Sequence, residues 1–188
     1  MNKQSPTNIL AHDGVVVLPT DTLYGICASA LSKKAVERIY TIKGRDENKP
    51  FIILIDHVNQ IKNFGIKLTK EQKVFLEHIW PNPVTVIIPR VSKKFAYLHR
   101  QTEALAFRLP KSQKLREFLE KTGPLVAPSA NPQGEKPAET IREAKEYFGN
   151  TVDRYIAGGR KVGTPSTIIK LSHTGEYEIV RQGRFKLK

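Results

Sequence analysis

Short apolar runs alternate with amphipathic stretches along the whole chain, which indicates strands intermingled with helices. Residues 15–18 and residues 51–55 are continuously apolar and are predicted as buried strands, the second of them covered on both faces. Shorter apolar runs predict strands over 84–88, 104–109 and 125–127, and a terminal hairpin of 167–171 with 177–181 around Thr174 and Gly175.

Helices are predicted where a capping residue precedes apolar positions at helical spacing. Ser5 with Pro6 predicts a first short helix that ends at Asp13 and Gly14. Four longer helices follow the same logic: from Ser32 to about Tyr40, from a Thr69–Gln72 capping box to about Ile79, from Ser112 to Gly123, and from a Thr140–Glu143 capping box to Gly149.

The order of these elements favours a mixed sheet. The predicted strands 84–88 and 104–109 follow one another without a predicted helix, and so do the strands of the terminal hairpin. Such neighbours pair antiparallel, whereas the other connections carry helices. The sequence therefore predicts an α/β fold, a twisted sheet of parallel and antiparallel strands with helices packed on it. With no linker long enough to divide the chain, residues 1–188 are predicted to form a single domain.

Composition narrows the class of function. The chain has 31 Lys and Arg against 18 Asp and Glu, a net charge of +13 that favours nucleic acid, nucleotides or an acidic partner as ligands. The basic residues are scattered, which indicates a charged folded surface. No apolar stretch approaches the ~20 residues that span a membrane, so no membrane association is expected. The single cysteine, Cys27, excludes an internal disulfide and fits a cytoplasmic location; its small apolar neighbours indicate packing.

Polar clusters follow several predicted strands. The first, Pro19–Gly25, places hydroxyls, a carboxylate and a phenol directly after the strand 15–18, where ligands of open α/β sheets collect. A turn whose Thr and Asp side chains cap the next segment is the alternative explanation. Equivalent clusters are Lys43–Lys49, Arg108, Ser129–Asn131, Thr164–Thr167 and Arg181–Arg184. If they converge, their cations and hydroxyls suit a phosphate or carboxylate ligand.

Several common catalytic motifs are absent. The chain contains neither a G-x-x-x-x-G-K-[ST] loop nor a G-x-G-x-x-G loop, and its five histidines show no metal-ligand spacing. Ser129 has no evident histidine partner, so nucleophilic catalysis by Ser129 or Cys27 is disfavoured. Positioning and charge stabilisation, as in nucleotidyl transfer, are the better prediction.

Six motifs in register carry a family resemblance. The chain resembles the YrdC/TsaC family of threonylcarbamoyl-AMP synthases over residues 9–184, in the short form without an extra C-terminal domain. The matching motifs are Pro19–Gly25, Lys43–Arg45, Trp80–Thr85, Phe107–Pro110, Ala127–Asn131 and Pro165–Ile168.

The resemblance implies a YrdC-like fold with a basic concave cavity. It also implies a reaction that joins L-threonine, bicarbonate or CO2, and ATP, with Mg²⁺ accompanying the ATP, to give threonylcarbamoyl-AMP and pyrophosphate. A separate tRNA threonylcarbamoyl-transferase complex would then modify the adenosine beside the anticodon in tRNAs that read codons beginning with A. Direct contact of this chain with tRNA stays open.

The resemblance also implies roles for individual residues. Lys43 and Arg45 match the K-x-R pair and are expected to be catalytic, facing the nucleotide phosphates. The spacer Asp46–Asn48 departs from the Pro-containing loop of many members, which leaves open whether Asn48 or Lys49 contacts ATP. The expected ATP-binding residues are Arg45, Lys49, Ser129, Asn131 and Arg181, and the expected threonine-binding residues are Thr22, Arg108 and Ser166.

Two other functions fit parts of the same pattern. A non-catalytic RNA- or tRNA-binding module would use the same cations, and its affinity would fall steeply with salt. An acyl-transfer enzyme would use Ser129 as nucleophile and react with a covalent serine probe. Only the synthase requires ATP, threonine and bicarbonate together.

Overall fold

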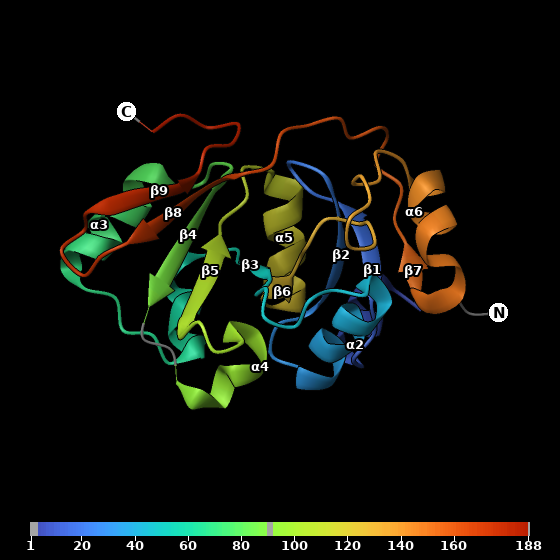
Figure 1. The fold of residues 1–188 in the computed structure, drawn as a ribbon, viewed down its shortest axis with the longest axis horizontal. Helices are drawn as coiled ribbons and strands as arrows, with labels where there is room; N and C mark the ends of the chain where they lie inside the picture. The colour runs from blue at the N-terminus through green and yellow to red at the C-terminus, as the bar shows by residue number, and fades with distance from the viewer. Residues whose placement is uncertain (1–3, 90–91, 188) are drawn as a thin grey trace.

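The computed structural model of the chain describes residues 4–89 and 92–187. Within them one nine-stranded sheet has the order β7-β1-β2-β6-β3-β5-β4-β8-β9, with the N-terminal strands and the C-terminal hairpin at opposite ends (Figure 1). The strands are β1 (Val16–Pro19), β2 (Tyr24–Ser29), β3 (Ile52–Leu54), β4 (Val84–Pro89), β5 (Ala104–Arg108), β6 (Leu125–Val126), β7 (Arg154–Tyr155), β8 (Thr167–Leu171) and β9 (Tyr177–Arg181).

Strand pairing confirms the predicted mixed sheet. Parallel pairs join β1 with β7, β3 with β5, and β4 with β8. Antiparallel pairs join β1 with β2, β4 with β5, and β8 with β9, while β6 pairs antiparallel with both β2 and β3. Strands that follow one another in sequence therefore pair antiparallel in three places, β1 with β2, β4 with β5 and β8 with β9, whereas the parallel pairs are reached by longer connections.

The predicted helices form close to their expected bounds. Ser5, Ser32, Thr69, Ser112 and Thr140 each cap a helix with the side-chain oxygen. The helical segments are α1 (Pro6–Ala11), α2 (Lys33–Lys43), η1 (Val58–Phe64), α3 (Lys70–Ile79), η2 (Lys93–Phe95), α4 (Ala96–His99), α5 (Gln113–Thr122), α6 (Ile141–Phe148) and η3 (Gly149–Thr151).

Three predictions of local structure need correction. Tyr24–Ser29 forms strand β2, which its small residues and glycine concealed and which antiparallel pairing with β1 holds in place. Two short helical segments, η2 and α4, lie between β4 and β5, where no helix was expected. The Thr69–Gln72 capping box forms, but the Glu143 carboxylate accepts from the amide of Glu139, so Thr140 and Glu143 do not complete a reciprocal box.

The core lies on both faces of the sheet. Val16 and Leu18 of β1 pack with Leu10 of α1 and with Leu115 and Leu119 of α5. Alternate strand residues point to the opposite face, where the larger cluster joins the sheet to α2, α3, α4, α6 and η1. Because both faces are covered around β1, β2, β3 and β6, polar groups gather where these strands end and the connecting loops begin.

Candidate functional site

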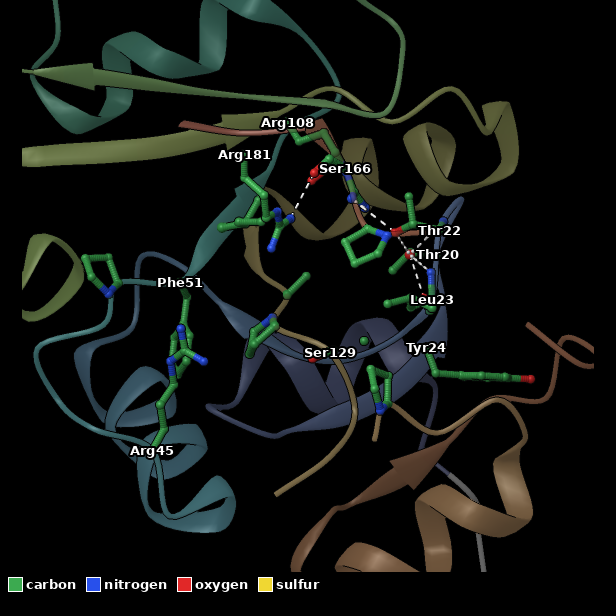
Figure 2. A pocket seen from close by; sticks show the side chains of 17 residues that line it. Thr20, Thr22, Leu23, Tyr24, Arg45, Phe51, Arg108, Ser129, Ser166 and Arg181 are labelled. Atoms are coloured by element: carbon green, nitrogen blue, oxygen red, sulfur yellow. Dashed lines mark hydrogen bonds between the residues drawn. The ribbon is translucent and has the colours of Figure 1, made fainter. Parts of the chain in front are cut away.

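One cleft collects strand ends and loops from distant parts of the chain. It holds about 730 Å³ of empty space, its open mouth included. Figure 2 shows side chains from several elements around this cleft. Six of the nine predicted site residues line it, namely Thr22, Arg45, Arg108, Ser129, Ser166 and Arg181, together with Thr20, Leu23, Tyr24, Phe51 and neighbouring backbone.

The Pro19–Gly25 motif forms the turn between β1 and β2. The Thr20 hydroxyl donates to the carbonyl of Leu23 at 2.6 Å and accepts from the amides of Thr22 and Leu23, each at 3.2 Å. These bonds show that the Thr20 side chain stabilises the turn, which was the alternative explanation for this motif. They fix the backbone of Thr22, whose hydroxyl lies in the cleft (Figure 2).

Ser129 reaches the cleft because its segment runs along the start of β2. Gly25 and Ser129 form an isolated antiparallel bridge, and the amide of Ile26 donates to the carbonyl of Pro128 at 3.0 Å. The amide of Ala130 donates to the carbonyl of Tyr24 at 2.8 Å. Backbone pairing therefore brings two motifs, more than 100 positions apart in the sequence, to one wall of the cleft.

Arg108, at the end of β5, is a buried cation with a buried carboxylate partner. Its Nη2 lies 2.9 Å from Oδ1 of Asp21, and its Nη1 donates to the Thr22 hydroxyl at 3.2 Å. Burial lowers the pKa of the Arg108 guanidinium and Asp21 opposes that shift, so the arginine stays charged and paired. Asp21 belongs to the predicted Pro19–Gly25 cluster but had no predicted role of its own, because nothing in the sequence links it to Arg108, 87 positions away.

Arg45 and Arg181 line the cleft without a carboxylate partner. Neither has an ion pair with any described residue. Arg45 donates from Nε to the carbonyl of Lys49 at 3.0 Å, and Arg181 donates from Nη2 to the carbonyl of Ser166 at 2.9 Å (Figure 2). Burial is the first cause of a lowered pKa at both guanidinium groups. Their remaining N–H groups suit an oxyanion ligand.

Lys43 lies behind the cleft wall. The residue is 3% exposed, and its Nζ donates to the carbonyl of Ser129 at 2.5 Å and to the carbonyl of Asn131. Its own carbonyl accepts from the amide of Gln133 at 2.9 Å. Burial, and then the charge of Arg45, lower the pKa of Lys43 to about 7. The ammonium thus holds the Ser129–Asn131 segment and does not line the cleft.

Lys49 and Asn131 also lie outside the cleft lining. Lys49 is exposed, and its ammonium is 3.7 Å from Oδ2 of Asp46. The buried Asn131 amide donates to the carbonyls of Pro132 at 2.9 Å and Glu135 at 2.8 Å, which shapes the loop after Ser129. The structure therefore brings together most of the predicted residues but places these two side chains beside the cleft.

A glycine-rich segment from residue 158 to 166 borders the cleft near Thr22. The Tyr24 hydroxyl donates to the carbonyl of Gly159 at 2.7 Å and accepts from the amide of Gly158 at 2.9 Å. A Cβ on Gly163 would lie 2.7 Å from the carbonyl oxygen of Thr22, closer than any ordinary contact. Gly163 thus lets the segment approach the β1–β2 turn, and Tyr24 anchors it.

The cleft offers no set of metal ligands. Its lining contains no Asp, Glu, His or Cys side chain. Across residues 4–89 and 92–187, no group of three such side chains is placed to hold a metal ion. Mg²⁺ prefers carboxylates together with substrate phosphates, so these residues do not fit a resident magnesium site. The same described residues contain no helix long and apolar enough to cross a bilayer.

The fold and the cleft together define a class. A mixed α/β sheet whose strand ends surround a cleft with hydroxyls and unpaired guanidinium groups is an α/β domain suited to a small anionic ligand. The chain belongs to the Sua5/YciO/YrdC family, whose model, described as "Telomere recombination", matches residues 8–183. This match confirms the resemblance drawn from the six motifs.

Curated relatives share a name. A threonylcarbamoyl-AMP synthase from Methylobacillus flagellatus is 31% identical over 171 residues, which cover 89% of this chain and 94% of the relative. One from Pyrococcus abyssi is 32% identical over 162 residues, which cover 84% of this chain but 47% of the relative. The chain therefore spans nearly the full length of one relative and about half of the other.

Solved structures agree with this fold. The structure of P. abyssi Sua5 complexed with L-threonine superposes with a TM-score of 0.85 at 28% identity, covering 94% of this chain and 52% of that one. Escherichia coli YciO superposes with a TM-score of 0.80 at 24% identity, covering 94% of this chain and 86% of that one, a likeness of fold alone.

Proposed function

We propose that this chain is an L-threonylcarbamoyladenylate synthase, a nucleotidyltransferase that forms threonylcarbamoyl-AMP and pyrophosphate from L-threonine, bicarbonate or CO2, and ATP. The observation that carries the proposal is the convergence of Thr22, Arg45, Arg108, Ser129, Ser166 and Arg181 on one cleft. The names of the curated relatives and the threonine complex of P. abyssi Sua5 support the same reaction.

Threonine is proposed to lie at the end of the cleft built by the β1–β2 turn. There Arg108 holds the Thr22 hydroxyl at 3.2 Å, and the buried Ser166 hydroxyl lies 2.8 Å from that of Thr85. This end offers fixed hydroxyls and a compensated cation, which suit a zwitterion better than a multiply charged anion.

The triphosphate is proposed to lie along the unpaired guanidinium groups of Arg45 and Arg181. Lys49, Ser129 and Asn131 complete the proposed nucleotide side, Ser129 from the cleft wall and the other two from its margin. Since no group of three potential ligands is found in residues 4–89 and 92–187, we propose that Mg²⁺ arrives on the ATP phosphates as part of the substrate.

The proposed reaction brings together two anions, the carbamate of threonine and the triphosphate of ATP. The threonine amine adds to CO2 with loss of a proton, or to bicarbonate with loss of water, to form a carbamate. A carbamate oxygen then attacks the α-phosphorus of ATP as pyrophosphate leaves. The cations around the cleft offset the repulsion between carbamate and phosphates. The cleft lining contains no carboxylate or imidazole, so we propose that solvent or ATP itself takes the proton of the amine.

The product is proposed to serve tRNA modification. A separate transferase complex would move the threonylcarbamoyl group to the adenosine beside the anticodon in tRNAs reading codons that begin with A. Because the reaction uses ATP and its product is consumed on tRNA, we propose the cytoplasm as the place of action.

The decisive experiment uses ATP, labelled bicarbonate and each amino acid in turn. Label retained in an adenylate only with threonine supports the proposal, and retention with no amino acid contradicts it. Arg45→Ala should lose pyrophosphate release by at least about a hundredfold with the fold intact, because it removes an unpaired guanidinium that stabilises charge in the transition state. Lys43→Ala should lose it as well, through the Ser129–Asn131 segment that Lys43 holds.

Arg142→Ala is a charge-matched control, because that side chain is 85% exposed on α6 and pairs with Glu146 on the same helix. Near-normal turnover in Arg45→Ala would count against the assignment. Tight RNA binding that falls steeply with salt, without ATP turnover, would favour the RNA-binding alternative that the net charge of +13 also allows. Labelling by a covalent serine probe would favour acyl transfer by Ser129.

A further inference from the structure

Four side chains form a continuous row that begins outside the cleft and ends in it. The rings of Tyr40 and Phe51 stack with centroids 4.1 Å apart and an interplanar angle of 25°. The Arg100 guanidinium carbon lies 4.0 Å from the Tyr40 ring centroid, and that of Arg45 lies 5.2 Å from the Phe51 centroid. We call Arg100, Tyr40, Phe51 and Arg45 the stacked row. Only Phe51 and Arg45 line the cleft, where Figure 2 shows them side by side.

A single carbonyl ties the row together at the cleft. The Tyr40 hydroxyl and Nε of Arg45 both donate to the carbonyl of Lys49, at 3.1 and 3.0 Å. Nε is thereby fixed, while no described carboxylate pairs with the Arg45 guanidinium. The direction in which the free Nη groups point therefore depends on the Phe51 ring and on this carbonyl.

Arg100 anchors the distant end of the row. Its Nη2 lies 2.6 Å from Oε2 of Glu37 on α2, and its Nη1 lies 3.7 Å from Oε2 of Glu47 in the loop that carries Arg45. Its side chain is 12% exposed, and its backbone has a φ of 45°, the left-handed region that a non-glycine residue seldom adopts. Such a conformation persists only where surrounding contacts hold it.

We infer that Arg100 and Tyr40 are positioning residues for Arg45, and that the stacked row sets the affinity of the cleft for the triphosphate of ATP. Arg100 fixes Tyr40, Tyr40 fixes Phe51 and the Lys49 carbonyl, and these two groups aim the Arg45 guanidinium. The threonine end of the cleft contains no member of the row. The inference rests on the proposed function in naming ATP as the ligand.

The test compares ATP binding by calorimetry, and the KM values for ATP and threonine, in four variants. Arg100→Gln should weaken ATP binding by about threefold to tenfold and leave the KM for threonine within about twofold, because it removes the cation from Tyr40 and the contacts to two carboxylates. Arg100→Lys should recover part of the loss. Tyr40→Phe, which keeps the stack but loses the bond to Lys49, should show a smaller effect of about twofold.

The matched control is Arg38→Gln. Arg38 lies on α2 outside the stacked row, and its substitution breaks a 2.6 Å ion pair with Asp153. It should leave both KM values unchanged even if it lowers stability. Equal ATP affinity in Arg100→Gln and the unaltered protein would overturn the inference, as would equal changes in both KM values. An unaltered protein that binds ATP but makes no threonylcarbamoyl-AMP would instead refute the proposed function, and the binding comparison would still decide the inference.

Discussion

The two ends of the cleft treat positive charge differently. At one end, which we call the paired end, Arg108 is bound by Asp21 and Thr22. Three other cations, Lys43, Arg45 and Arg181, meet backbone carbonyls and no carboxylate of the described residues, and we call them the unpaired end. Lys43 lies behind the cleft wall, and Arg181 donates to the carbonyl of Ser166. Both ends contain a cation that is nearly inaccessible to water, Arg108 at 5% and Lys43 at 3% exposure.

This difference distinguishes charges that stabilise the fold from charges that are available to a ligand. A buried charge that already has its partner stabilises the fold and orders its neighbours, while a buried charge without one is costly and marks a place where a ligand supplies the missing anion. The charge of Arg108 is thus paired before any substrate binds, while its Nε has no hydrogen-bond partner among the described residues. Arg45 and Arg181, which line the cleft, gain most from an anion, which agrees with the proposed position of the triphosphate.

The largest effect is expected from breaking the paired end. Asp21→Ala leaves the Arg108 guanidinium buried without a carboxylate, which should lower the free energy of unfolding by about 3–5 kcal/mol. Chemical denaturation followed by circular dichroism measures the change. Asp21→Ala combined with Arg108→Met should recover much of that loss, because the double variant buries no unpaired charge. A single variant as stable as the unaltered protein would show that the two ends do not differ as described.

A pH-dependent effect is expected at the unpaired end. The pKa of Lys43 falls from 10.5 to about 7 because burial disfavours the ammonium. Between these values the unfolded chain binds the proton and the folded protein does not, so Lys43 contributes a rise in stability as pH increases from about 7 to 10.5. Lys43→Met should remove this rise.

Denaturation midpoints measured at several pH values in that window test the prediction. Lys170→Met is the control, since that lysine is exposed on β8. Parallel pH profiles for the unaltered protein and Lys43→Met would contradict a lowered pKa at Lys43.

The smallest effect is expected from Arg181, the exposed member of the unpaired end. Arg181→Gln should raise the KM for ATP by about threefold to tenfold and leave stability within about 0.5 kcal/mol, because solvent screens an exposed charge. Steady-state kinetics at two salt concentrations measure this, and added salt should shrink the difference between the two proteins. An unchanged KM for ATP at low salt would show that Arg181 does not bind the triphosphate.

Local signals in the sequence predicted most elements but missed those that depend on partners. The capping residues Ser32, Thr69 and Ser112 act within one turn of chain, so their helices were predictable. β2 was missed because its glycine and small residues have weak strand propensity, and only its register against β1 makes it a strand.

The same distinction between local signals and long-range contacts applies to the candidate site. The motifs by themselves determined which residue types gather at the strand ends, since hydroxyls and cations after buried strands are visible in the chain. Only the tertiary structure decided how each charge is balanced. Three contacts join segments far apart in sequence: Arg108 with Asp21, Lys43 with the carbonyls of Ser129 and Asn131, and Arg100 with the ring of Tyr40. Charge compensation depends on distance in space and on exclusion of water, and the order of residues along a chain contains neither quantity.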